Sequence, residues 1–133
     1  MSLKLARRER EGVIIFDLTG RLVAGEETSV LRDAIKETAA AGPAQVILNL
    51  ASVDYIDSTG LGSLVICFSA LRKAGGTIKL LNLSRRNVEL LVLTKLETVF
   101  EVFVDEQDAV NSFFPDREVK KFDILAFVQS HKR

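Results

Sequence analysis

The sequence predicts an α/β domain in which helices pack on a small mixed β-sheet. Three observations favour this class: short apolar runs rich in β-branched residues, stretches with apolar residues at helical spacing, and an alternation between the two along the chain. Two strands come first, and each later helix returns the chain to a new strand, which favours parallel pairing from there on. With 133 residues and 47% apolar content, the chain has enough material for one core.

The first two predicted strands lie near the N-terminus. Residues 13–18, VIIFDL, form a β-branched and aromatic run between Gly12 and Gly20, which is typical of a short buried strand. The weaker segment over residues 3–9 is expected to pair with it as an edge strand. The N-terminal stretch is basic, but no apolar segment follows it, so we expect neither a signal peptide nor a membrane span.

A helix and a central strand are predicted next. Apolar positions recur at helical spacing over residues 28–39, and Gly42-Pro43 closes the pattern, so this segment is predicted as an amphipathic helix. Residues 45–50, QVILNL, lack polar alternation and are typical of a strand that is covered on both faces. Residues 51–58 are predicted to form a loop that leads from this strand into the next helix.

Helix and strand continue to alternate in the second half. Leu61, Leu64 and Leu71 belong to a second helical stripe, which Gly75-Gly76 terminates. The remaining predicted elements are a strand over residues 77–81, a helix entered through Ser84, a strand over residues 99–104 and a short helix from Asp105 to about Pro115. Residues 1–115 are therefore predicted to form one domain.

Residues 116–133 are predicted to be a helical appendage to that domain, because they follow a proline and contain an apolar cluster of their own. Apolar side chains fall on too many sides of such a helix for all of them to remain in water. We expect Phe122, Leu125 and Phe127 to dock on the domain or to form a homodimer contact. A packed C-terminal helix is the simpler of these outcomes.

Composition and charge exclude several classes of function. Eighteen basic and eighteen acidic residues give a net charge of zero, so no overall field draws the chain to nucleic acid or to an anionic membrane. The basic clusters Arg7-Arg8-Arg10 and Arg85-Arg86 are interpreted as solvated surface. Cys67 is the only cysteine and lies in an apolar run, which favours a core residue in a reducing cytoplasm.

The sequence also offers little support for an enzyme. His131 is the only histidine and falls in the appendage, so we expect no Ser-His-Asp or Cys-His site in the domain, and no metal site. The glycines do not form GxxxxGK[ST] or GxGxxG, the phosphate-binding patterns of nucleotide enzymes. We therefore predict a protein that is not an enzyme and that carries no cofactor.

The most specific local feature is the segment over residues 54–62, DYIDSTGLG, which joins a buried strand to an apolar helix. It places the hydroxyls of Ser58 and Thr59 at a helix N-terminus, where unpaired N–H groups and the helix dipole accommodate an anion such as phosphate. Gly60 and Gly62 allow close approach of another backbone or of a nucleotide. Spacing alone favours a simpler interpretation, in which Ser58 or Thr59 is an N-cap.

The same segment resembles the core motif of STAS domains, particularly that of the anti-sigma factor antagonists. The matching strings are VILNL at residues 46–50, Val53, YIDSTGLG at residues 55–62, LTGRL at residues 18–22, Gly75-Gly76 and residues 96–103. The resemblance covers roughly residues 3–114, and it implies a small mixed sheet flanked by helices.

In that family the serine after the motif aspartate, which is Ser58 here, is phosphorylated by an anti-sigma factor that is also a serine kinase. The resemblance implies that the unphosphorylated protein binds this kinase, which then releases its sigma factor, and that phosphate breaks the complex. A metal-dependent serine phosphatase would restore binding. Thr59 is the less favoured phosphate acceptor. The implied partner contacts are Asp57, Thr59, Gly60, Leu61, Gly62 and Glu26.

One departure from the family pattern concerns the loop after Gly20-Arg21-Leu22. Many antagonists have an aspartate there beside the phosphorylated serine, whereas this chain has Val23-Ala24-Gly25 followed by Glu26 and Glu27. Glu26 is a candidate substitute, although its carboxylate is shifted and stands on a longer stem. Two alternatives stay open: a ligand-sensing, nucleotide-sensing or stress-signalling scaffold module of the STAS type without reversible phosphorylation, and an oligomerisation protein that works through the appendage.

Overall fold

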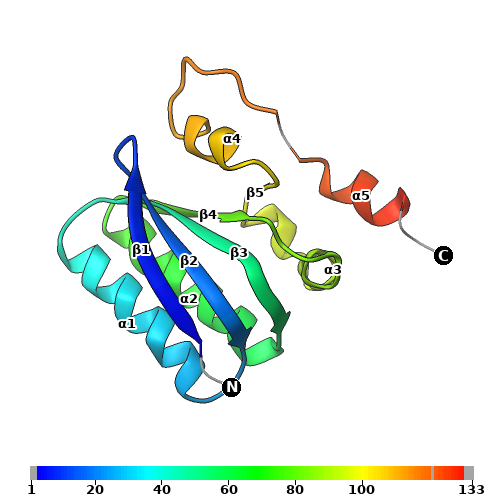
Figure 1. Ribbon diagram of the computed structural model, residues 1–133, viewed down its shortest axis with the longest axis horizontal. Coiled ribbons are helices and arrows are strands. Elements are labelled where there is room, and N and C mark those ends of the chain that lie inside the picture. Colours follow the sequence, from blue (N-terminus) through cyan, green and yellow to red (C-terminus); the bar gives the residue numbers. More distant parts are fainter. Residues whose placement is uncertain (1–2, 121, 131–133) are drawn as a thin grey trace.

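A computed structural model describes residues 3–120 and 122–130. A five-stranded sheet forms its centre, with the strand order β1-β2-β3-β4-β5 (Figure 1). The strands are β1 (Lys4–Arg10), β2 (Val13–Leu22), β3 (Gln45–Ile56), β4 (Thr77–Leu81) and β5 (Val102–Phe103). β1 and β2 are antiparallel and the pairs from β2 to β5 are parallel, so the predicted mixed sheet is confirmed.

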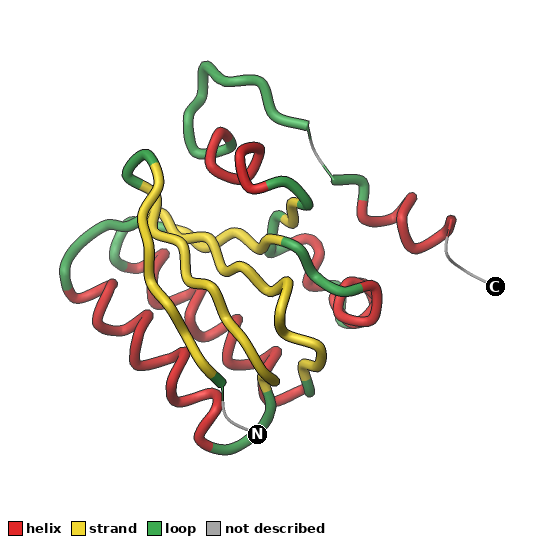
Figure 2. Tube along the Cα trace, viewed as in Figure 1, coloured by secondary structure: helices red, strands yellow, loops and turns green. Residues whose placement is uncertain are grey.

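Helices cover both faces of this sheet. α1 and α2 lie side by side on one face, and α4 lies on the other face, as the tube view also makes visible (Figure 2). The helices are α1 (Glu26–Ala40), α2 (Ser58–Lys73), α3 (Arg85–Leu93), α4 (Glu106–Asn111) and α5 (Ile124–Ser130), with a 3-10 turn, η1, at Leu96–Thr98. The helices predicted from apolar spacing are therefore confirmed in type and order.

The alternation of side chains along each strand produces two hydrophobic cores. Phe16 of β2 and Leu48 of β3 point into the larger core, which α1, α2 and α3 close. Their neighbours Ile15 and Ile47 point to the opposite face, into a smaller core under α4. Because both faces are covered, the central strands carry no polar alternation, as the sequence of residues 45–50 predicts.

The turn between β1 and β2 explains why these strands pair as a hairpin. Glu11 and Gly12 are the two loop residues, and their φ angles are 54° and 84°. Two-residue loops with both φ angles positive have a twist that matches that of the flanking strands. The edge strand expected over residues 3–9 is thus confirmed, and it pairs from Lys4 to Arg10.

The loop predicted over residues 51–58 is wrong for most of its length, because β3 continues to Ile56. The end of β2 pairs with Ser52, Val53, Tyr55 and Ile56, with one shift in register between Asp17 and Thr19 and a second between Gly20 and Arg21. Val53 and Ile56 are buried in the larger core, at 1% and 4% exposure. A bulge breaks the simple alternation of apolar residues along a strand, so the strand predicted from the sequence ended too early, at residue 50.

The strand predicted over residues 99–104 is also shorter than expected. Only Val102 and Phe103 pair with β4, and Val99, the first residue of the predicted strand, is the C-cap of η1. Lys95, with a φ of 62°, lies in the left-handed region and turns the chain into η1. Phe100, at 2% exposure, follows η1 into the larger core. The apolar run is therefore shared between a turn and a two-residue strand.

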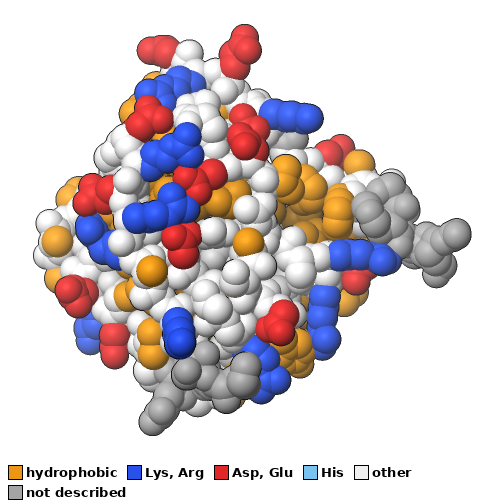
Figure 3. Space-filling model, viewed as in Figure 1, with side chains coloured by type: hydrophobic (Ala, Val, Ile, Leu, Met, Phe, Trp, Pro, Cys, Tyr) orange, Lys and Arg blue, Asp and Glu red, His pale blue; other side chains and the backbone are white. Residues whose placement is uncertain are grey.

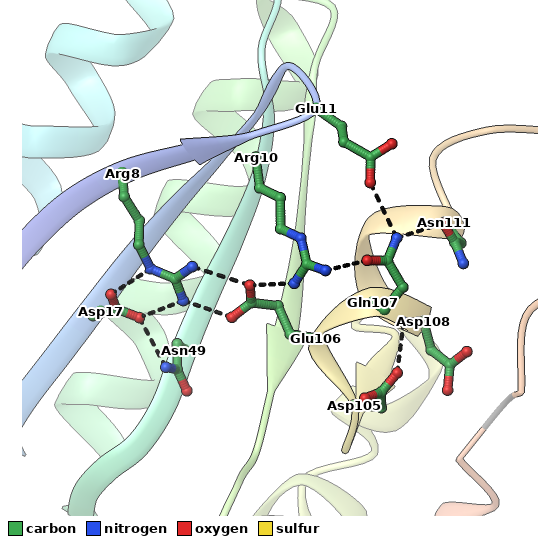
Figure 4. Close-up of polar contacts among 10 residues, drawn as sticks. All are labelled: Arg8, Arg10, Glu11, Asp17, Asn49, Asp105, Glu106, Gln107, Asp108 and Asn111. Atoms are coloured by element: carbon green, nitrogen blue, oxygen red, sulfur yellow. Dashed lines mark hydrogen bonds and ion pairs between the residues drawn. The ribbon is translucent and has the colours of Figure 1, made fainter.

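An ion-pair network ties β1 to α4 on the side of the smaller core (Figure 4). Arg8 contacts Asp17 at 2.7 Å and Glu106 at 2.6 Å. Arg10 contacts Glu106 at 2.7 Å, and Asn49 donates to Asp17 at 2.8 Å. Basic and acidic side chains accordingly intermix over this side of the surface (Figure 3). Two arginines interpreted from the sequence as solvated surface thus also join an edge strand to a helix.

The described residues 116–120 and 122–130, here called the C-terminal strap, contain the helix α5, which begins at Ile124. Phe122 and Ile124 pack against the larger core, so the expected docking on the domain is confirmed for Phe122. The ring of Phe127 lies 5.3 Å from that of Phe122. Leu125 is 53% exposed, so it does not dock on the domain, and its alternative role in a homodimer contact stays a prediction.

Candidate functional site

The candidate site lies where β3 passes into α2, at the carboxyl end of a parallel strand. Ile56 is the last residue of β3, Asp57 is the N-cap of α2, and Ser58 is the first helical residue. The side chains of Ser58 and Thr59 are both exposed. The sequence prediction that two hydroxyls stand at this helix N-terminus is therefore confirmed.

Asp57 connects the start of α2 to the loop that follows β2. Its Oδ1 accepts a hydrogen bond from the backbone N–H of Gly60 at 2.7 Å, and its Oδ2 accepts one from the N–H of Ala24 at 3.0 Å. Its own N–H donates to the carbonyl oxygen of Leu22 at 3.1 Å. We call these three bonds the Asp57 clamp, because they hold residues 22–24 against the beginning of α2.

The clamp keeps a negative charge directly beside Ser58. The backbone N–H of Gly60, followed by that of Ala24, lowers the pKa of the Asp57 carboxyl below its ordinary value of 3.8. The positive end of the helix dipole favours the same ionised form. At neutral pH the residue next to Ser58 is therefore a carboxylate whose lone pairs are used by main-chain donors.

Gly60 is required by this arrangement. A Cβ atom added to Gly60 would lie 2.0 Å from the carbonyl oxygen of Leu22, closer than any real contact allows. The sequence left open whether another backbone or a nucleotide approaches here, and in the structure it is the chain's own backbone at the end of β2 that does so. Gly62 differs, because an added Cβ would meet nothing within 4 Å and the position is exposed.

Neither hydroxyl is used as a helix cap. Asp57 supplies the capping oxygen, so the interpretation of Ser58 or Thr59 as the N-cap is wrong. Within the described part of the chain, neither of the two hydroxyls makes a hydrogen bond. An aspartate one residue earlier offers the same acceptor with full charge, which is why the serine remains available.

One face of α2 carries Ser58, Gly62 and Ile66 outward at a spacing of four residues, and all three are exposed. Ile66 is 55% exposed, a feature that the sequence interpretation missed. Its signal was present, since Ile66 falls outside the buried stripe of this helix. Leu61 was expected to contact a partner, but it is only 5% exposed and its side chain belongs to the larger core, as the buried Gly60 does.

The loop before α1 differs from the predicted arrangement in one respect. Glu26 is the first residue of α1 and follows the N-cap Gly25, whose φ of 116° favours glycine. The side chain of Glu26 lies outside what the structure describes, as does His131. Ala24 provides a main-chain N–H to Asp57, a contact that depends on the fold and that no motif in the sequence indicates.

Other reactive groups lie away from this site or are inert. Burial raises the pKa of the Cys67 thiol to about 11, which agrees with its interpretation as a core residue. Over residues 3–120 and 122–130, no cluster of histidine, cysteine and carboxylate side chains is arranged to hold a metal ion. In the same residues, no helix combines the length and apolar character of a membrane span.

The chain belongs to the STAS-domain family. The family model for the STAS domain matches residues 4–109, a range that contains the whole Asp57 clamp and the exposed face of α2 around Ser58. The sequence resemblance over roughly residues 3–114 is therefore confirmed. The C-terminal strap falls outside the matched range.

A named relative points to one branch of this family. The anti-sigma-B factor antagonist of Bacillus subtilis strain 168 is 31% identical over 110 residues, which are 83% of this chain and 99% of that protein. The chain thus resembles that protein over nearly its entire length, including the segment around Ser58.

Solved structures agree on the fold. An anti-sigma factor antagonist from Mycobacterium paratuberculosis has a TM-score of 0.73 and 22% identity, covering 84% of this chain and 93% of that one. The Bacillus cell fate determinant SpoIIAA in its phosphorylated form has a TM-score of 0.65 and 19% identity, covering 83% of this chain and 99% of that one. The mixed sheet with its flanking helices is therefore a STAS fold.

Proposed function

We propose that this protein is an anti-sigma factor antagonist that switches partners through phosphorylation of Ser58. In its unphosphorylated form it binds an anti-sigma factor that is also a serine kinase, and phosphate on Ser58 releases it. The observation that carries the proposal lies at the start of α2. Asp57 caps the helix there, so the exposed Ser58 hydroxyl has no structural role.

Two relatives support this function. The Bacillus subtilis protein that is 31% identical over nearly its whole length is named an anti-sigma-B factor antagonist. A structural neighbour, SpoIIAA, has been solved in a phosphorylated form, so the fold tolerates phosphate in that protein. In this chain the segment that corresponds to the family motif offers an accessible hydroxyl next to a fixed carboxylate.

The charges around Ser58 explain why phosphate should act as an off signal. A phosphoserine adds nearly two negative charges beside Asp57. The positive end of the α2 dipole stabilises the phosphate by about 0.3–1 kcal/mol. In the free protein the phosphate remains hydrated, because Ser58 is exposed. In a complex it would have to lose that water against Gly62 and Ile66, at a cost of several kcal/mol. The cost of desolvating the phosphate in the complex exceeds its stabilisation by the helix dipole, so phosphorylation should weaken binding.

The proposed switch operates in the cytoplasm and depends on two enzymes, a kinase and a phosphatase. The kinase consumes ATP and holds a sigma factor, so the exchange takes place in the cytoplasm, and a metal-dependent serine phosphatase returns the antagonist to its binding form. The chain itself acts as a binding protein and a phosphate acceptor rather than as an enzyme. Glu26 and Thr59 border the contact surface around Ser58 in this proposal.

The first experiment tests the phosphate acceptor. Incubation with the anti-sigma kinase of the source organism and Mg-ATP should add one phosphate, which mass spectrometry of peptides should locate on Ser58. Ser58→Ala should accept none and bind the kinase constitutively, whereas Thr59→Ala should be phosphorylated normally. Because Asp57 and not Ser58 is the cap, the Ser58→Ala free energy of unfolding should stay within about 0.5 kcal/mol of wild type.

Three outcomes would contradict the proposal. Phosphate on another residue would contradict Ser58 as the acceptor, and a Ser58→Glu variant that binds the kinase as tightly as wild type would contradict the off signal. Nucleotide bound tightly to this chain, with no transfer of phosphate, would favour the sensing function instead.

The second experiment tests the binding face on α2. Ile66→Asp should weaken kinase binding by about tenfold or more, because a charge replaces an exposed apolar contact near Ser58. Leu93→Asp is the matched control, since Leu93 is 81% exposed on α3. Isothermal titration calorimetry should separate the two variants, and equal losses for both would place the contact elsewhere.

A further inference from the structure

A groove of about 360 Å³ lies between α1 and α2, the two helices that lie side by side on one face of the sheet (Figure 1). Cys67 and Ala70 of α2 line its apolar part together with Ile66, which is 55% exposed. Arg32 and Lys36 of α1 line it with exposed side chains. The groove therefore combines an apolar wall on α2 with basic side chains on α1.

The groove continues the exposed face of α2 that begins at Ser58. The residues at intervals of four along this side of the helix are Ser58, Gly62, Ile66 and Ala70. With a rise of about 1.5 Å per residue, Ile66 lies about 12 Å along the helix from Ser58, and Ala70 lies about 18 Å from it. A protein interface of standard size buries about 800 Å² on each partner, which corresponds to a disc of about 16 Å radius. A kinase interface centred on Ser58 therefore covers Ile66 and reaches the groove.

The basic side chains of the groove are not neutralised by acidic partners. Among the described residues, neither Arg32 nor Lys36 makes an ion pair. Burial raises the pKa of the Cys67 thiol to about 11, and the charge of Arg32 acts in the opposite direction, so the guanidinium lies towards α2. Asp33 is the one acidic side chain among the described residues that line the groove. Two basic side chains and one acidic side chain leave the lining with a net positive charge.

We propose that this groove is a docking site for an amphipathic segment of the anti-sigma kinase. The segment places an apolar side chain beside Ile66 and offers carboxylates to Arg32 and Lys36. This inference rests on the proposed function, since it specifies a second contact made by the same partner. Amphipathic helices commonly bind in this way, with their apolar face in a groove and their charged side chains at its rim.

The charge and the apolar wall favour a protein partner over a nucleic acid. Nucleic-acid binding typically involves about six to ten phosphate contacts, whereas this groove offers two basic side chains beside Asp33. An exposed isoleucine also gains nothing from a phosphate, but an apolar side chain would remove it from water. Charges at the rim of an interface act mainly on the rate of association and on the choice of partner. The groove would thus select the kinase, while phosphate on Ser58 would end the complex.

The test measures binding of the full chain to the anti-sigma kinase by surface plasmon resonance, in a Ser58→Ala background that cannot be phosphorylated at Ser58. Arg32→Glu combined with Lys36→Glu should lower the association rate constant by about tenfold at low salt and change the dissociation rate constant by less than about twofold. The difference should shrink as NaCl is added, because salt screens exposed charges. Lys120→Glu is the control, since Lys120 lies beside α4 and should affect neither rate constant.

Two further variants test the sign of the charge. Arg32→Gln combined with Lys36→Gln adds no repulsion within α1 and should still slow association by about threefold. Asp33→Asn should speed association by about twofold, because it removes the charge that repels a carboxylate. Slower association of Asp33→Asn would indicate a basic partner surface and overturn the proposal, as would unchanged association of both double variants.

The remaining outcomes separate this inference from the proposed function. Self-association of the chain that the Arg32→Glu and Lys36→Glu changes abolish would assign the groove to a second copy, and it would overturn the proposal. Failure of the Ser58→Ala chain to bind the kinase at all would contradict the proposed function and this inference with it. Kinase binding that is insensitive to the groove variants would contradict this inference alone.

Discussion

A single methyl group distinguishes alanine from glycine, and at Gly60 the backbone of Leu22 leaves no room for it. The added Cβ would lie 2.0 Å from the Leu22 carbonyl oxygen, which belongs to backbone and cannot swing aside. Gly60→Ala must therefore push α2 away from the loop and strain the Asp57 clamp. We expect the free energy of unfolding in urea to fall by about 1–3 kcal/mol.

Gly62→Ala is the matched control, two residues further along the same helix. Its added Cβ meets nothing within 4 Å, and the position is exposed in the helix. Alanine has the higher helix propensity, so the free energy of unfolding should rise by about 0.5–1 kcal/mol. Changes of the same sign in both variants would show that the contact with Leu22 is not what constrains this helix.

At the scale of secondary structure, the network between β1 and α4 predicts a dependence on pH. Glu106→Gln removes the charge that both Arg8 and Arg10 contact, and the free energy of unfolding at pH 7 should fall by about 1 kcal/mol, since these groups are partly exposed. Glu9→Gln is the control. Glu9 pairs with Arg7 at 3.3 Å, and both side chains are more than half exposed. That variant should change stability by less than about 0.5 kcal/mol.

The sign of the pH effect follows from the direction of the pKa shifts. Hydrogen bonds from Arg8 lower the pKa of Glu106 below its ordinary value of 4.5, and they lower that of Asp17 below 3.8. The unfolded chain then binds more protons than the folded chain as acid is added, so the contribution is complete above about pH 5 and disappears below it. The stabilities of wild type and Glu106→Gln should therefore converge as the pH falls below the ordinary pKa of 4.5, and a constant gap would contradict the ion-pair explanation.

For the whole molecule, the C-terminal strap should stabilise the domain that it covers. Truncation after Pro115 removes Phe122 and Ile124 from the larger core. Two such side chains contribute about 1.5–3 kcal/mol each before the entropy of ordering the strap is subtracted. We expect a net loss of about 2 kcal/mol in the free energy of unfolding, measured by chemical denaturation.

Leu125→Ala in the full chain is the control for truncation, because this exposed side chain contributes little to the core. Unchanged stability in the truncated protein would show that the strap does not support the domain. The mass of both proteins in solution tests the homodimer prediction, which requires a dimer of the full chain that the truncation dissociates.

The sequence allowed the order of the elements and the place of Ser58 to be predicted, because apolar spacing, glycine breaks and the motif are all local signals. The extension of β3 to Ile56 was missed, since it depends on pairing with β2 across a bulge. The Asp57 clamp was missed for a related reason, as its Ala24 donor lies 33 residues away in the chain. Contacts between distant segments leave no periodic pattern in a sequence.

The clamp has a consequence for how this chain can diverge from its relatives. Its partners at the end of β2 and in the loop that follows are main-chain atoms, namely the carbonyl of Leu22 and the N–H of Ala24. Side chains at positions 23 and 24 are thus free to change without moving Ser58. Under the proposed function, related antagonists can therefore differ in these two side chains and so suit different kinases, while the fold and the position of the serine stay the same.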